Sequence, residues 1–193
     1  MRGAVALLGA GVALALAVAS SSSARAAAAP RLPRRRWLLV GDSLAQGLEA
    51  GLRKRINAAG DELRAVSVVG TRAADWAGDT FAELLRDLSP DAVIVVLGTN
   101  DAAAASPQSF RTAASSIADD ANRAGVPLAW VEPPPLPPRL AGAEAVRAVV
   151  RDVATRAIPS DRAVAGRARD GVHYSPAGYD AWAAQIWAAL QSA

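Results

Sequence analysis

The segment 37–58 most constrains the fold, because its periodicity changes within a few residues. The apolar residues 37–40 lead directly into Gly41-Asp42-Ser43. Apolar side chains then recur at four-residue spacing, at Leu48, Leu52 and Ile56. A short apolar run followed at once by helical spacing predicts a buried strand that turns abruptly into a helix, with Ser43 at the turn.

Ser43 would lie at the positive end of that helix, beside backbone N–H groups that no helical carbonyl uses. Such a position favours an anion forming next to the serine oxygen. Serine is also a common helix N-cap, and from this segment alone the cap is the simpler interpretation. A choice between the two depends on residues much further along the chain.

The rest of the chain repeats the alternation of apolar runs and helical faces. Further strands are expected at 63–69, 91–97 and 126–131, with at most a short fifth strand near Ala163 and Val164. Helical spacing occurs at 81–88, 110–121 after a start at Ser106-Pro107, 146–153 and 176–190. This alternation indicates an α/β fold, a parallel sheet with helices on both faces. Ligands bind beyond the carboxyl ends of such strands, where Ser43, Gly70 and Asn100 would lie.

The first 28 residues have the pattern of a secretory signal peptide. A charged start, an uncharged Ala/Leu/Val-rich run and small residues around Arg25 follow one another. We therefore expect 1–28 to be a signal peptide, 29–36 a basic linker and 37–193 one domain, secreted or periplasmic, with no stable membrane insertion after cleavage. An uncleaved anchor is the alternative, although the run is slightly short for a span. The linker arginines could touch an anionic envelope surface, but a solvated linker is favoured.

Composition excludes several classes of protein. Cysteine is absent, so neither disulfides nor thiolate zinc sites are available. The sequence pI of about 10.1 comes largely from the N-terminal arginines. From Trp37 onward 15 basic residues face 18 acidic ones, which does not support nucleic-acid binding. The oligomeric state is left open.

His173 is the only histidine in the chain. It stands in Asp170-Gly171-Val172-His173, just before the last predicted helix. A carboxylate three residues earlier could bind Nδ1 and leave Nε2 free to take the proton of a serine, which needs such a base to act as a nucleophile. A histidine satisfied at the surface or in the core is the alternative.

A serine nucleophile also needs donors for the oxyanion of a tetrahedral intermediate. Candidates are the backbone N–H groups of Ser43 and Gly70 and the side-chain amide of Asn100. Individually, Gly70 is as readily explained by a turn, and Asn100 by the capping of a loop.

Taken together, four segments resemble the GDSL or SGNH hydrolases: Gly41-Asp42-Ser43-Leu44, Gly70, Gly98-Thr99-Asn100-Asp101 and Asp170-Gly171-Val172-His173. The resemblance implies a flavodoxin-like, three-layer α/β/α fold of about five strands and hydrolysis of acyl esters without a cofactor or metal. It implies Ser43 as nucleophile, His173 as base and Asp170 as its partner. Ser43, Gly70 and Asn100 would form the oxyanion hole.

The substrate pocket is less well defined by the sequence. Asp42, Arg72 and Trp76 are candidates for its wall, with ordinary helix packing as the alternative for Trp76. The proline-rich segment 132–138 could form another wall. A hard cation held by Asp42, Asp101 and Asp170 is a further alternative, but one histidine and no ligand motif make it the weaker one.

The expected activity is that of an exported serine esterase acting on short acyl esters, such as acetyl groups, of carbohydrates or small alcohols. The partner would be an ester substrate, such as a cell-envelope glycan. Acyl transfer to such a glycan, and lysophospholipid or thioester cleavage, are alternatives that the sequence leaves open. A binding module without activity is a third, although all three positions of the triad are filled. No Gly-x-Ser-x-Gly elbow of the usual α/β-hydrolases occurs.

Overall fold

The computed structural model describes residues 34–103, 107–160 and 165–192, all within the second of the chain's two units, 33–193. The signal peptide predicted at 1–28, the linker residues before Arg34, the helix-capping Ser106 and the strand predicted near Ala163 lie outside the described residues. Nothing among the described helices has the length and apolar character that a membrane crossing requires.

Within the described part of the chain, five parallel strands form one sheet in the order β2-β1-β3-β4-β5. The strands are β1 (Arg36–Gly41), β2 (Glu62–Ser67), β3 (Ala92–Val96), β4 (Leu128–Val131) and β5 (Arg156–Ile158). In the register, Val40 of β1 pairs with Val66 of β2 and Val95 of β3. The order and direction confirm the predicted flavodoxin-like sheet.

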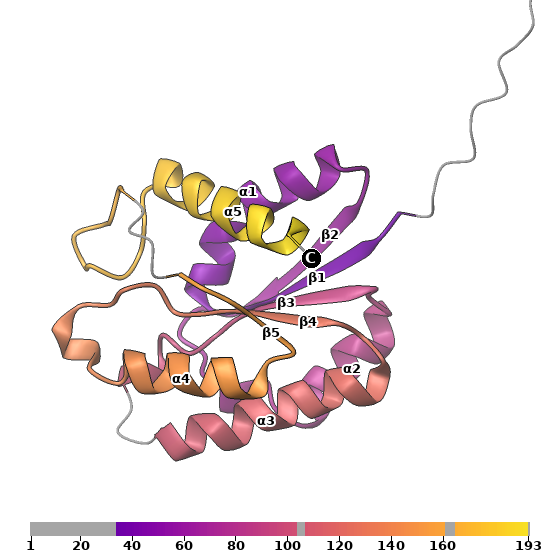
Figure 1. Cartoon of the computed structure of the whole chain (residues 1–193), viewed down its shortest axis with the longest axis horizontal. Coiled ribbons are helices and arrows are strands. Elements are labelled where there is room, and N and C mark those ends of the chain that lie inside the picture. Colours follow the sequence, from indigo (N-terminus) through magenta and orange to yellow (C-terminus); the bar gives the residue numbers. More distant parts are fainter. Residues whose placement is uncertain (1–33, 104–106, 161–164, 193) are drawn as a thin grey trace, which may run out of the picture. The chain divides into compact units, whose positions relative to one another are not determined.

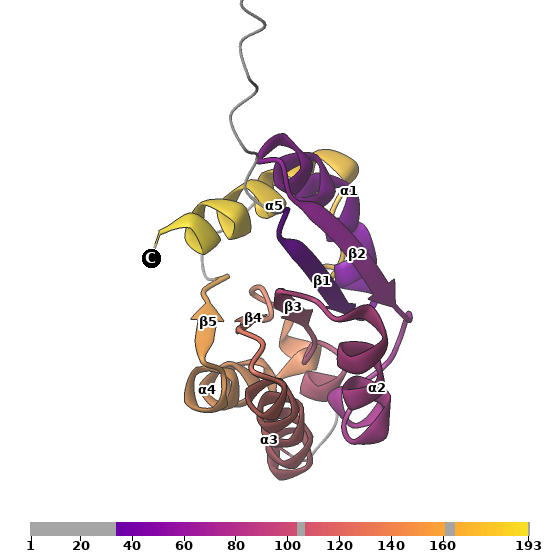
Figure 2. The same cartoon turned by 90° about the vertical axis from the view of Figure 1, so that its right-hand side faces the viewer.

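Helices cover both faces of the sheet (Figure 1). The α-helices are α1 (Ser43–Ala58), α2 (Asp79–Leu88), α3 (Pro107–Ala124), α4 (Ala143–Val153) and α5 (Pro176–Gln191). The described residues also form three short 3-10 helices, η1 (Ala73–Asp75), η2 (Asp101–Ala103) and η3 (Pro138–Leu140). Figure 2 shows α1 and α5 on one side of the sheet and α2, α3 and α4 on the other.

Each face of the sheet has its own apolar core. Leu38 and Val40 of β1 pack toward α2, α3 and α4, whereas Trp37 and Leu39 pack toward α1 and α5. All five residues of β3 are buried, because helices cover both of its faces. This double burial explains why β3 has a continuous apolar run rather than an alternating pattern.

Two predicted boundaries need correction. The fifth strand is Arg156–Ile158, before the segment where it was expected, and only its last residue is buried, so a three-residue strand had no pattern to reveal it. The predicted linker 29–36 ends too late, because Arg36 already belongs to β1. Its backbone N–H donates to Asp91 at 2.7 Å, and its guanidinium binds the same carboxylate.

The carboxyl ends of β1, β2 and β3 are drawn tightly together. A Cβ at Gly41 would lie 2.2 Å from the carbonyl oxygen of Val96, so only glycine permits this approach of β1 to β3. The Asp42 N–H donates to that oxygen at 3.3 Å, and the Gly41 oxygen accepts from the Val68 N–H at 3.0 Å. The loops that follow the three strands therefore begin at one edge of the sheet.

Candidate active site

Ser43 is the first residue of α1, and it is not the residue that caps the helix. The N-cap is Asp42, whose Oδ1 accepts from the Leu44 N–H at 2.9 Å. The serine hydroxyl is therefore available to another partner. Its Oγ lies 2.9 Å from Nε2 of His173, which is 130 positions away in the chain.

The loop before α5 holds Asp170 against His173. Asp170 Oδ2 lies 2.6 Å from His173 Nδ1, and its Oδ1 accepts from the N–H groups of Val172 at 2.8 Å and His173 at 3.0 Å. The hydrogen bond with the His173 ring, and then these backbone donors, hold the pKa of Asp170 well below its usual range. An ionised Asp170 fixes the proton on Nδ1, so Nε2 faces Ser43 as an acceptor.

The candidate oxyanion donors differ in whether they already form hydrogen bonds. Gly70 is exposed and has a positive φ of 81°, a conformation that glycine adopts readily. Within the described parts of the chain, neither its N–H nor that of Ser43 has a hydrogen-bond acceptor. Asn100 differs, because its Nδ2 donates to Asp42 Oδ2 at 3.0 Å and to the Thr71 carbonyl at 2.9 Å. Its two amide hydrogens thus connect the loops after β1 and β2.

Asp42 faces the protein interior and does not line an open pocket, contrary to the prediction. Its side chain caps α1 and binds Asn100, and the residue is 1% exposed. Burial raises the pKa of Asp42 to about 6, opposed in part by the hydrogen bond from Leu44. The residue therefore acts on Asn100 and α1 rather than on a substrate.

This raised pKa predicts a pH-dependent stability. Between about pH 4 and pH 6 the folded chain keeps a proton on Asp42 that the unfolded chain releases. The stabilising contribution of Asp42 to the free energy of unfolding is complete below the pKa that its carboxyl has in the unfolded chain. This contribution is lost as the pH rises through about 6. We expect the difference in unfolding free energy between wild type and Asp42→Ala to fall by about 2 kcal/mol from pH 4 to pH 7. Urea unfolding at each pH measures it.

Asp119→Ala is the matched control, because Asp119 is exposed on α3. Its difference from wild type should vary little over the same pH range. An Asp42→Ala difference that is equally constant would show that Asp42 does not hold the extra proton.

Trp76 packs in the core and is 4% exposed. This placement agrees with the alternative of ordinary packing. Its Nε1 donates to Thr71 Oγ1 at 2.9 Å, and the ring borders a hollow of about 360 Å³ lined by residues of β2, η1 and α2. It therefore fixes the segment after Gly70 from within. Arg72 is exposed, and a role for it in the pocket stays a prediction.

The described residues contain no group of three or more histidine, aspartate or glutamate side chains placed to hold a metal ion. All three aspartates considered for a cation instead accept hydrogen bonds from backbone N–H groups, Asp42 from that of Leu44. Asp101 Oδ2 accepts from the Ala73 N–H at 3.2 Å, which ties η2 to η1. Asp170 binds the His173 ring.

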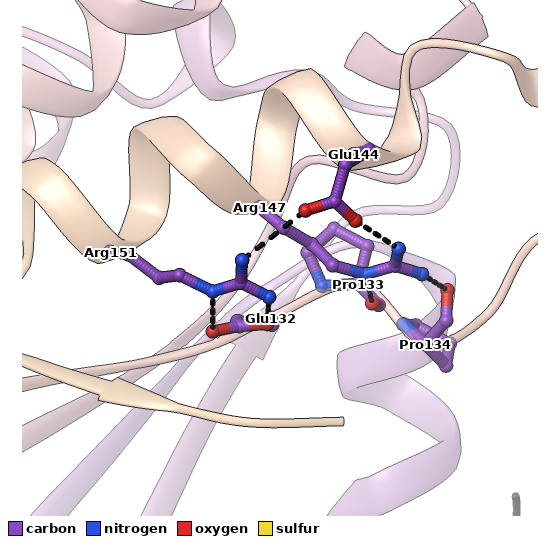
Figure 3. Close-up of polar contacts among 6 residues, drawn as sticks. All are labelled: Glu132, Pro133, Pro134, Glu144, Arg147 and Arg151. Carbon is purple, nitrogen blue, oxygen red and sulfur yellow. Dashed lines mark hydrogen bonds and ion pairs between the residues drawn. The ribbon is translucent and has the colours of Figure 1, made fainter. Parts of the chain in front are cut away.

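A network of charged side chains that the sequence did not reveal fixes segment 132–138 to α4 (Figure 3). Glu132 is 1% exposed, and both of its oxygens accept from Arg151 at 2.8 Å. Arg147 donates to the carbonyls of Pro133 and Pro134, at 2.9 Å each. Glu144 joins the two arginines. Their four-residue spacing places both on one helical face, but nothing in the sequence indicates what they bind.

Comparison with known families identifies this arrangement. A profile described as the GDSL-like Lipase/Acylhydrolase family matches residues 39–181, which include Ser43, Asn100, Asp170 and His173. The chain belongs to this family. Membership makes the GDSL-like chain a carboxylic ester hydrolase. A search of curated proteins found no significant match.

Solved structures share the fold of this GDSL-like hydrolase at low sequence identity. TesA superposes with a TM-score of 0.66 at 23% identity, covering 81% of this chain and 98% of TesA. A carbohydrate esterase family 3 protein from Talaromyces cellulolyticus gives 0.66 at 19%, covering 81% and 96%. An acetyl esterase variant with an acetate ion gives 0.68 at 19%, covering 81% and 96%. At these identities the likeness concerns the fold.

Proposed function

We propose that this GDSL-like hydrolase cleaves short acyl esters through an acyl intermediate on Ser43. The observation that carries the proposal is the continuous pair of hydrogen bonds from Ser43 Oγ to His173 Nε2, at 2.9 Å, and from His173 Nδ1 to Asp170 Oδ2, at 2.6 Å. A serine hydroxyl is a weak nucleophile unless a base takes its proton, and His173 is the base in contact with it.

In the acylation step, Ser43 Oγ attacks the ester carbonyl carbon while its proton passes to His173 Nε2. The ionised Asp170 stabilises the resulting imidazolium and keeps the ring oriented. The tetrahedral intermediate then collapses, the bond to the alcohol oxygen breaks, and His173 returns the proton to the leaving alcohol. The products of this step are the free alcohol and acyl-Ser43.

The oxyanion of the intermediate is bound by the N–H groups of Ser43 and Gly70. The positive end of α1 adds to this stabilisation. Asn100 donates as well if it exchanges its bond with the Thr71 carbonyl for one with the oxyanion, while Asp42 keeps the other amide hydrogen. The amide is held in place before substrate arrives.

Deacylation repeats the chemistry with water as nucleophile. His173 takes a proton from water, the hydroxide attacks the acyl carbon, and the serine leaves with the proton from His173. A sugar hydroxyl in place of water would give acyl transfer instead. The two outcomes differ only in the acceptor, so they are distinguished by weighing the products of a reaction that contains both an acyl donor and a glycan.

The proposed substrates carry acetyl or similarly short acyl groups on carbohydrates or small alcohols. Support comes from two structural neighbours, a carbohydrate esterase and an acetyl esterase. Export of the enzyme through residues 1–28 and a cell-envelope glycan as substrate remain predictions from the sequence. N-terminal sequencing of the chain isolated from its host tests the export.

A chain-length series tests the acyl preference. We expect kcat/KM for p-nitrophenyl esters to be highest for acetate and to fall by about 10-fold or more per two added methylenes, because a binding site selective for acetyl has no room for a longer chain. Release of acetate from acetylated xylan is measured alongside, with Ser43→Ala as the control for spontaneous hydrolysis. A maximum at octanoate or longer would favour lysophospholipid or thioester cleavage and contradict the proposal.

A further inference from the structure

The loop that carries Asp170 and His173 is built around one arginine. Arg167 Nη1 donates to the carbonyl oxygens of Gly171 at 3.2 Å and Val172 at 2.7 Å, directly between the two site residues. The backbone closes the same loop, because the Ala168 N–H donates to the His173 carbonyl at 2.9 Å. The guanidinium therefore occupies the inside of the turn that presents the imidazole.

Arg167 also joins this loop to the proline-rich segment 132–138. Its Nη2 donates to the Pro135 carbonyl, and its guanidinium carbon lies 4.2 Å from the centre of the Tyr174 ring. Among the described residues no carboxylate forms an ion pair with Arg167. Carbonyl oxygens and an aromatic face hold it instead, and an arginine placed in this way acts as a bridge between backbones.

Segment 132–138, to which Arg167 binds, is itself held in place by other side chains. Arg147 and Arg151 fix its first residues to α4, as Figure 3 shows. A further contact joins this region to the loop that carries Asp170 and His173. Arg139 of η3, just after the segment, donates to the Asp170 carbonyl. Pro137 lies 3.6 Å from the position that a Cβ would take at Gly171. The loop that carries Asp170 and His173 thus packs against the proline-rich segment, with Arg167 at the centre of the contact.

We propose that Arg167 is a positioning residue for the reaction, holding the Asp170–His173 loop on segment 132–138 so that Nε2 faces Ser43. The proposal rests on the proposed function, in which His173 is the base. Arginine suits the task because its planar fork presents several N–H donors in fixed directions, whereas a lysine ammonium is a point charge on a flexible stem.

The test compares Arg167→Met with Arg169→Met. Methionine keeps much of the stem and removes every donor. Arg169 lies two residues away, is exposed and has no side-chain hydrogen bond or ion pair within the described segments, so it is a matched control. We expect Arg167→Met to lower kcat for p-nitrophenyl acetate by about 10- to 100-fold, since a misplacement of about 1 Å can have that effect, with KM changed less than about twofold. Arg169→Met should match wild type.

Nuclear magnetic resonance supplies a readout that does not depend on activity. Because the chain has one histidine, the Nδ1–H resonance of His173 needs no further assignment. Its short hydrogen bond to Asp170 should place this proton far downfield in wild type and in Arg169→Met. In Arg167→Met we expect it to move upfield or broaden, with an unchanged far-ultraviolet circular dichroism spectrum.

Arg167→Lys covers the case in which Arg167→Met does not fold. It keeps the charge and one possible carbonyl bond, so kcat should fall between those of wild type and Arg167→Met, or below wild type if Arg167→Met is unfolded. Wild-type kcat and an unmoved His173 resonance in a folded Arg167 variant would overturn the proposal. If wild type and Ser43→Ala hydrolyse esters equally, the proposed function fails instead, and the resonance still reports whether Arg167 positions His173.

Discussion

Replacing Ser43 by alanine is expected to lower kcat for p-nitrophenyl acetate by about a million-fold, the loss seen when a serine nucleophile is removed from a complete triad. The reason is that water must then attack the ester without an acyl intermediate, while the oxyanion donors and the binding site persist. Stopped assays at high enzyme concentration, corrected for the buffer rate, measure the residual activity.

The fold should survive this substitution. Asp42, not Ser43, caps α1, and the hydrogen bond that Ser43 Oγ forms is with His173. We therefore expect the circular dichroism spectrum and melting temperature of Ser43→Ala to match wild type closely. Ser116→Ala, on α3, is the matched control and should keep full activity. A Ser43→Ala variant that retained more than about one hundredth of wild-type kcat would exclude Ser43 as the nucleophile.

Replacing His173 by alanine should cause nearly the same loss, again about a million-fold in kcat. Without the imidazole nothing takes the Ser43 proton, so the hydroxyl is present but unreactive. Because the two residues act as a unit, the double variant Ser43→Ala/His173→Ala should be no slower than either single variant within about threefold. The same ester assay on the three variants measures this.

Additive losses in the double variant would show that Ser43 and His173 act independently. The distance of 2.9 Å between their reactive atoms would then have no chemical role. Asn57→Ala, at the other end of α1 from Ser43, serves as a control for general effects on that helix. It should leave kcat unchanged.

Much of the fold was predictable because a parallel sheet covered on both faces needs apolar strands. β3 is buried at every residue, and its run of Ala, Val and Ile is unmistakable in the sequence. The meeting of Ser43 and His173 follows from the same topology, since one residue comes directly after β1 and the other stands just before α5, which packs against α1. The prediction that Ser43 and His173 act together rested on the local motifs and on their resemblance to the GDSL hydrolases.

Other features depend on long-range contacts that leave no mark in the sequence. β5 has three residues at the edge of the sheet, too few for a periodic pattern. The burial of Asp42 results from the approach of three strand ends, and local sequence indicates only a polar residue before a helix. Arg167 binds carbonyl oxygens, which every residue has, so no partner residue type could reveal its role.

Mass spectrometry of the chain treated with a fluorophosphonate shows whether Ser43 is a nucleophile activated by His173. Such reagents phosphonylate an activated serine, and the tryptic peptide 37–53 contains Ser43 as its one serine. We expect a single adduct on this peptide in wild type, and none in Ser43→Ala or in folded His173→Ala. An adduct on another residue, or equal labelling of His173→Ala, would contradict it.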